Sequence, residues 1–214
     1  MNNIPEEEEL KRKLREYDRR YPAILDDAKP HLVEGRAVDL GHTLDALEVL
    51  LDLFKLDPQL KASHRILIPS VIFHDCGWSK VPKNMLPGSY GDVKEDNPGK
   101  IIHQEQGAGI ARRILKKHSY PEDCIEEVSF IVSVHDKPEE YKKHALAGIV
   151  AEIDKLVRYK PTLFWGLIND GTFKNREERV AFLEKGLGKW FTKPEFRQKA
   201  ASLLEERKRE QGKP

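Results

Sequence analysis

Apolar residues recur at helical spacing through most of the chain. The stretch from Leu40 to Phe54, LGHTLDALEVLLDLF, places its apolar residues three or four positions apart, as an amphipathic α-helix does. The same spacing predicts core helices over residues 101–118, 119–135 and 144–159. We find no run of alternating apolar and polar residues that would predict a strand. The pattern therefore predicts an all-α protein, built as a helical bundle.

Two further helices are predicted before residue 80. The charged segment 6–20 is typical of a solvated outer helix. A second, more apolar helix is expected to end at Asp75, with Gly77 as its C-terminal stop. Because proline disrupts a helix interior, this helix should begin near Pro69 or bend there.

A long segment from Pro82 to Gly99 lacks periodicity and is rich in Pro, Gly, Asn and Asp. This composition predicts a loop. A loop of this length is either a flap over a site or a connector, and the sequence favours neither. Asn97 and Pro98 form a suitable cap and first turn for the helix that follows.

The C-terminal part of the chain predicts a helix over residues 176–187 and another after Thr192. Thr192 stands three residues before Glu195, which is the spacing of a capping box. We expect one helical domain over residues 1–214, with a core at about 36–159 and a C-terminal helical extension at 160–214.

Charge and cysteine content narrow the possible partners. The 37 Lys and Arg residues nearly balance the 36 Asp and Glu residues, so no bulk charge favours a nucleic-acid polymer or an anionic membrane. No apolar run is long enough to cross a bilayer, and the first residues lack the apolar stretch of a signal peptide. Cys76 and Cys124 are too few for a disulfide framework. We expect a cytoplasmic protein, and the sequence favours no particular oligomeric state.

Several histidines and aspartates lie on helix faces that should be buried. His42, for example, shares its face with Ala46 and Val49. Buried carboxylates and imidazoles need a compensating charge, and a divalent metal provides one. The candidate ligands are His42, His74, Asp75, His103, His135 and Asp154.

Six ligands exceed what one catalytic metal needs while it keeps a position open for water. Two metals that share a carboxylate fit the set better. Consecutive helix residues point roughly 100 degrees apart, so His74 can bind one metal while Asp75 bridges towards the second.

The order His, His-Asp, His, His, Asp resembles the HD-domain superfamily of metal-dependent phosphohydrolases. His42, His74, Asp75 and Asp154 match its core signature, and His103 with His135 resemble the extra ligands of the binuclear branch. The resemblance spans roughly residues 36–159 and rests on GHTLDALEVL, IFHDCG, HQEQGAGIARRIL and AEIDKL. It implies a helical HD-domain bundle and divalent ions, expected to number two, drawn from Mn, Fe, Co, Zn, Ni or Mg.

One position departs from the superfamily. Many members carry Lys immediately after the glycine, where this chain has Trp78. Lys80 follows two residues later, and Lys80, Lys83 and Arg112 are the candidate contacts for a substrate phosphate.

The resemblance implies hydrolysis of a small, nucleotide-like phosphate ester by metal-activated water. The candidate catalytic residues are Asp75, as the bridging ligand, and Asp136, which follows His135 and could orient a ligand or handle a proton.

Two alternative functions stay open. The same ligand order is shared by mixed-valent diiron oxygenases that resemble myo-inositol oxygenase, and imidazole and carboxylate suit iron as well as manganese or zinc. A non-catalytic nucleotide-sensing module with a metal-stabilised fold is the other possibility.

Overall fold

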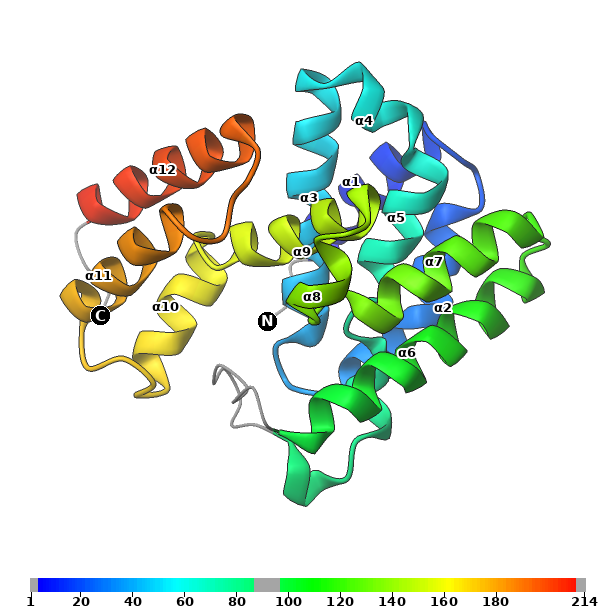
Figure 1. Ribbon diagram of the computed structural model, residues 1–214, viewed down its shortest axis with the longest axis horizontal. Coiled ribbons are helices and arrows are strands. Elements are labelled where there is room, and N and C mark those ends of the chain that lie inside the picture. The colour runs from blue at the N-terminus through cyan, green and yellow to red at the C-terminus, as the bar shows by residue number, and fades with distance from the viewer. Residues whose placement is uncertain (1–3, 87–96, 211–214) are drawn as a thin grey trace.

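The computed structural model describes residues 4–86 and 97–210, and its regular elements are helices (Figure 1). No strand occurs in these residues, so the prediction of an all-α protein is confirmed. The α-helices of the described residues are α1 (Ile4–Arg15), α2 (Tyr21–Glu34), α3 (Asp39–Leu56), α4 (Pro58–Ala62), α5 (His64–Phe73), α6 (Pro98–Lys117), α7 (Glu122–Val134), α8 (Pro138–Tyr141), α9 (Ala145–Val157), α10 (Pro161–Asn169), α11 (Arg176–Leu187) and α12 (Pro194–Arg209). Two short 3₁₀ turns, η1 (Cys76–Lys80) and η2 (Lys83–Met85), follow α5.

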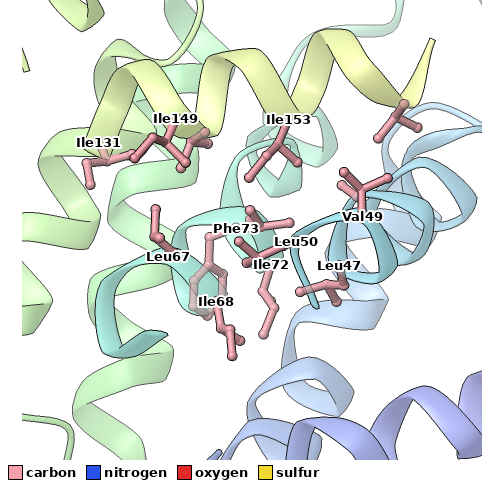
Figure 2. Close-up of a cluster of buried hydrophobic side chains, with 14 of the residues drawn as sticks. Leu47, Val49, Leu50, Leu67, Ile68, Ile72, Phe73, Ile131, Ile149 and Ile153 are labelled. Carbon is pink, nitrogen blue, oxygen red and sulfur yellow. The ribbon is translucent and has the colours of Figure 1, made fainter. Parts of the chain in front are cut away.

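Helix α5 lies at the centre of the core. Every residue from Leu67 to Phe73 is buried, because α5 packs against α3, α7 and α9 on different sides. Figure 2 shows Phe73 and Ile72 of α5 beside Leu50 of α3 and Ile153 of α9. The central position of α5 carries the residues that follow it, His74 and Asp75, into the interior.

Pro69 lies inside α5. Proline has no amide N–H, so the carbonyl of Arg65, four residues earlier, lacks its usual helical donor. The hydroxyl of Tyr120 donates to this carbonyl at 2.9 Å. A side chain from the segment before α7 thus satisfies the acceptor that proline leaves free, and α5 continues to Phe73.

The turn after α5 packs tightly against α6. A Cβ atom at Gly77 would lie 1.8 Å from the carbonyl oxygen of His103 and 2.5 Å from the amide nitrogen of Gly107. Glycine is therefore required for η1 to approach α6 this closely. α6 in turn lies beside α7, and Figure 1 shows the two running next to each other.

The C-terminal helices α10, α11 and α12 gather at one end of the molecule, beyond α9 (Figure 1). α12 contacts both α9 and α11, and α10 contacts α3. Within the described residues, no helix is long and apolar enough to span a membrane.

Some local predictions require correction. The hydrophobic pattern predicts no helix over residues 21–34 or 161–169, where α2 and α10 form. The capping box at Thr192 is wrong, because its hydroxyl and its amide N–H both donate to Glu152 of α9 and the N-cap of α12 is Lys193. The cap at Asn97 is confirmed, since its side chain accepts from the amide of Gly99 at 2.7 Å.

The predicted loop from Pro82 to Gly99 lies largely outside the described residues, since residues 87–96 fall there, and its role as flap or connector stays open. At its described ends, the Asn97 side-chain amide donates to the carbonyl of Met85 at 3.3 Å.

Candidate metal centre

Five helices or helix ends bring the candidate ligands together. His42 comes from the first turns of α3, and His74 and Asp75 follow α5 directly. The others are His103 on α6, His135 at the end of α7 and Asp154 on α9. All but Asp154 are buried, and the Asp154 side chain is 13% exposed.

The first group of ligand atoms consists of His42, His74 and Asp75. The Nε2 atoms of His42 and His74 lie 3.1 Å apart. Asp75 Oδ2 lies 3.7 Å from Nε2 of His42 and 3.5 Å from Nε2 of His74. Asp154 joins this side through its Oδ1 atom, 3.0 Å from Nε2 of His42.

The second group consists of Asp75, His103 and His135. Nε2 of His103 lies 3.5 Å from Nε2 of His135. In each group, one possible ligand atom from every residue lies within 4.8 Å of the others. Asp75 belongs to both groups, which is the arrangement that a bridging carboxylate requires.

Backbone contacts orient the imidazoles. Nδ1 of His74 donates to the Val71 carbonyl at 2.7 Å, and Nδ1 of His135 donates to the Val132 carbonyl at 2.8 Å. His103 makes a longer contact, 3.3 Å, with the carbonyl four residues before it. Since Nδ1 donates in these contacts, Nε2 is the ring atom that faces the other ligands. This is the usual outer-shell arrangement of metal-binding histidines.

Two of the candidate histidines, His74 and His103, have lowered pKa values, and a third, His42, has a raised pKa. Burial lowers the pKa of His74, and burial together with neighbouring His135 lowers the pKa of His103 to about 3. Both rings are thus neutral near pH 7 and can act as ligands. Burial opposes the charge of His42, but its contacts with Asp154 and Asp75 raise its pKa overall. A cation would displace that proton.

Arg36 forms an ion pair with Asp75 that sequence reasoning missed. Its guanidinium donates to Asp75 Oδ2 at 2.8 Å and to Asp39 Oδ1 at 2.7 Å. Burial favours the neutral acid, but Arg36 and then His74 lower the pKa of Asp75 far below its usual range. Burial, with the charge of Asp75, raises the pKa of Asp39 to about 7 although Arg36 opposes this. Asp75 is therefore the ionised partner.

Lys155 is a second cation that sequence reasoning missed. Its Nζ atom lies 2.6 Å from Asp154 Oδ2 and 3.7 Å from Asp136 Oδ1. Burial disfavours the charge of Asp136, but His135 and Lys155 outweigh it and lower the Asp136 pKa to about 2. Asp136 Oδ2 also lies 3.7 Å from Nε2 of His103. The carboxylate thus sits between Lys155 and the second group.

The three candidate substrate residues lie elsewhere. Arg112 is 42% exposed and pairs with Glu126, at 2.5 Å. Lys80 is exposed and close enough to His31 to lower its pKa, after the larger effect of burial. Lys83 is exposed in η2. Within the described residues, none of the three forms an ion pair with the candidate ligands, so their role in substrate binding stays a prediction.

The sequence contains only weak indications that Arg36, Lys155 and Trp78 belong to the site. Arg36 lies three residues before α3 begins and Lys155 immediately follows Asp154, so proximity to a ligand was the available clue. Trp78 departs from the superfamily pattern. Its contacts with Asp75 and His103 depend on how η1 packs against α6, which the sequence does not display.

The donor set fits divalent metal ions. Neutral imidazole nitrogens and ionised carboxylates converge, which are ligands that such ions accept. In the structure, Arg36 and Lys155 balance the charge of the carboxylates of Asp75 and Asp154. A family model described as HD domain matches residues 40–159, which is more than half of the 214-residue chain. No curated protein and no solved structure matches the chain. The chain belongs to the HD-domain family, part of a superfamily of metal-dependent phosphohydrolases.

Proposed function

We propose that this protein hydrolyses a small, nucleotide-like phosphate ester with two divalent ions. The observation that carries the proposal is the position of Asp75, which belongs to both groups of converging ligand atoms. A carboxylate shared in this way suits a pair of ions better than one ion. Family membership supports the reaction class.

His42, His74, Asp75 and Asp154 would hold one ion, and Asp75, His103 and His135 the other. The ions would be drawn from Mn, Fe, Co, Zn, Ni or Mg, which accept imidazole and carboxylate ligands to different degrees. When bound, such ions polarise a phosphoryl oxygen and lower the pKa of a coordinated water.

The substrate phosphate would contact Arg36 and Lys155. Their side chains are 15% and 17% exposed, so each reaches solvent beside the ligands. Both are held by carboxylates of the site, Arg36 by Asp75 and Lys155 by Asp154. A phosphate oxygen that reaches either side chain would gain a charge-assisted hydrogen bond. Contacts of the substrate with Lys80, Lys83 or Arg112 stay predictions.

Asp136 would orient the ligands of the second group. It is 21% exposed, ionised at neutral pH and within 4.0 Å of both His103 and His135. A carboxylate with a pKa of about 2 is too weak a base to take a proton efficiently near pH 7, so its expected contribution is its negative charge beside the two imidazoles. Lys155, 3.7 Å away, holds the carboxylate in place.

The deciding experiment compares metals and reactions in parallel. The metal-free protein is loaded with Mn²⁺ or with iron under oxygen, and phosphate release from a nucleotide panel is measured together with oxygen uptake. We expect phosphate release that His74→Ala abolishes. His118→Ala, which removes a histidine paired with Asp27 outside the centre, should keep it.

Other outcomes would select the alternatives. Oxygen uptake with iron, without phosphate release, would assign the protein to oxygenases of the myo-inositol oxygenase kind. Nucleotide binding without either reaction would favour the sensing module.

A further inference from the structure

Trp78 links two of the candidate ligands. Its side chain is 1% exposed, and its ring stacks on the His103 imidazole with centroids 4.1 Å apart and an interplanar angle of 7°. Its indole N–H donates to Asp75 Oδ1 at 3.0 Å. One residue thus contacts His103 through its ring face and Asp75 through its polar edge.

The hydrogen bond from Trp78 completes the support of the Asp75 carboxylate. Arg36 donates to Oδ2, and Trp78 donates to Oδ1. Because each oxygen has its own donor, rotation of the carboxylate plane would break at least one bond. The guanidinium of Arg36 also lies over the indole, with its central carbon 4.4 Å from the ring centroid. Arg36 and Trp78 therefore hold each other as well as Asp75.

The stack on His103 compensates for a weak backbone contact. His74 and His135 are oriented by Nδ1 hydrogen bonds of 2.7 and 2.8 Å, whereas the corresponding contact of His103 is 3.3 Å. A long hydrogen bond restrains ring rotation poorly. The parallel indole plane restrains the same rotation, because turning the imidazole would drive its edge into Trp78.

These contacts are concentrated on one of the two groups. Trp78 contacts two of the three members of the second group, Asp75 and His103, but of the first group it contacts Asp75 alone. We propose that Trp78 is a positioning residue for the ion held by Asp75, His103 and His135. The inference rests on the proposed function, since it requires two ions.

Calorimetric titration of the metal-free protein with Mn²⁺ tests this positioning role. Trp78→Phe keeps a ring that can stack but removes the N–H. We expect the weaker of two binding events to lose about 10- to 100-fold in affinity, as is typical for outer-shell partners, and the tighter event to lose less, because the first group keeps His42 and His74 besides Asp75. Trp78→Leu, which also removes the ring, should lose more. Trp165→Phe is the matched control, because it removes an indole hydrogen bond to Glu210 outside the centre.

A spectroscopic readout separates positioning from general destabilisation. Stepwise loading with Co²⁺ should give a visible spectrum whose second increment changes more in Trp78→Phe than the first increment does. Thermal unfolding of the metal-free variants checks their folding. Trp78→Tyr places a second kind of ring, also without the indole N–H, at that position. Trp78→Tyr and Trp78→Phe should lose affinity at the second binding event to a similar extent.

The outcomes distinguish the inference from the proposed function. Equal losses at both binding events, or no loss at either, would overturn the role of Trp78 while two-ion hydrolysis stands. A single binding event in the wild-type protein would overturn both the inference and the two-ion form of the proposed function. Phosphate release by the wild type, assayed separately, decides the reaction.

Discussion

Lys155 and Asp154 are consecutive residues of α9, yet their charged ends meet at 2.6 Å. Neighbouring helix positions point roughly 100 degrees apart, so the long lysine side chain must bend back across the helix surface. It does so where Asp136 offers a second carboxylate, 3.7 Å from Nζ. The lysine thereby joins the end of α7 to α9 at the mouth of the candidate centre.

Lys155→Met should impair turnover while metal binding persists. Removing the cation leaves the ligands intact but takes away a charge-assisted contact for phosphate, and such contacts contribute about 1.5–3 kcal/mol, or roughly 10- to 100-fold in kcat/KM. Steady-state phosphate release and metal analysis measure the two effects. Lys160→Met is the matched control, because Lys160 is similarly exposed and pairs with Asp45 and Glu48. Unchanged kcat/KM in Lys155→Met would contradict the assignment.

Asp75→Ala should lose metal and activity together. As the shared ligand, Asp75 is needed by both groups. Its removal also takes away one of the two carboxylates to which Arg36 donates and leaves the other, Asp39. Asp136→Ala should keep its metal and lose turnover. Metal content after gel filtration and phosphate release test both variants, with the exposed Asp52→Ala as control. Equal metal content in wild type and Asp75→Ala would disprove the bridging role.

Chelation should lower the melting temperature. Ions that bind the folded state stabilise it, by about 2.7 kcal/mol when free metal is a hundredfold above Kd. For a chain of this size that corresponds to roughly 5–10 °C in Tm. Calorimetry with and without chelator measures the shift. The Asp75→Ala variant should show little or no shift, and a shift equal to that of the wild type would place the stabilising metal elsewhere.

Gly77→Ala and Gly109→Ala should have opposite effects on stability. A Cβ at Gly77 meets backbone atoms of α6 that cannot move aside, so we expect destabilisation by about 1–3 kcal/mol or more. Gly109 lies on the exposed side of the same helix with nothing within 4 Å of its Cβ position. Alanine there should stabilise the protein by about 0.5–1 kcal/mol. Urea unfolding compares them, and similar destabilisation by both would contradict the packing account.

Glu7→Gln should destabilise the protein at pH 7 and much less at pH 3. Burial favours the neutral acid, but Lys29 and Lys11 lower the Glu7 pKa below 4.5. Stability from this carboxylate is fully present above pH 4.5 and is lost as the pH falls through the lowered value. Urea unfolding of wild type and variant at both pH values measures the gap. A gap of equal size at pH 3 would show that packing, not charge, ties α1 to α2.

Helical phase explains why the candidate ligands could be predicted from sequence. A histidine or aspartate that repeats with buried apolar residues must point inward, and His42, His103, His135 and Asp154 all do so. For the pair His74-Asp75, helical phase was not needed as evidence of burial. The pair follows an apolar helix, and such a helix is expected at the centre of the core. The all-α class followed from the same periodicity.

The supporting residues depend on distances between helices, which periodicity does not contain. Arg36, Trp78 and Lys155 act through side chains that reach across from one element to another. α2 was missed for a different reason. Pro30 lies inside it, and the helix persists because this proline sits on its exposed side, where the carbonyl four residues earlier can face water.

The central position of α5 also links the metal centre to the tertiary fold. His74 and Asp75 follow a helix that is covered by α3, α7 and α9. The ligands of the two groups come from widely separated parts of the chain and share no local segment apart from this pair. The complete set of ligands therefore exists only where these helices have come together, so the free energy of metal binding is also free energy of folding.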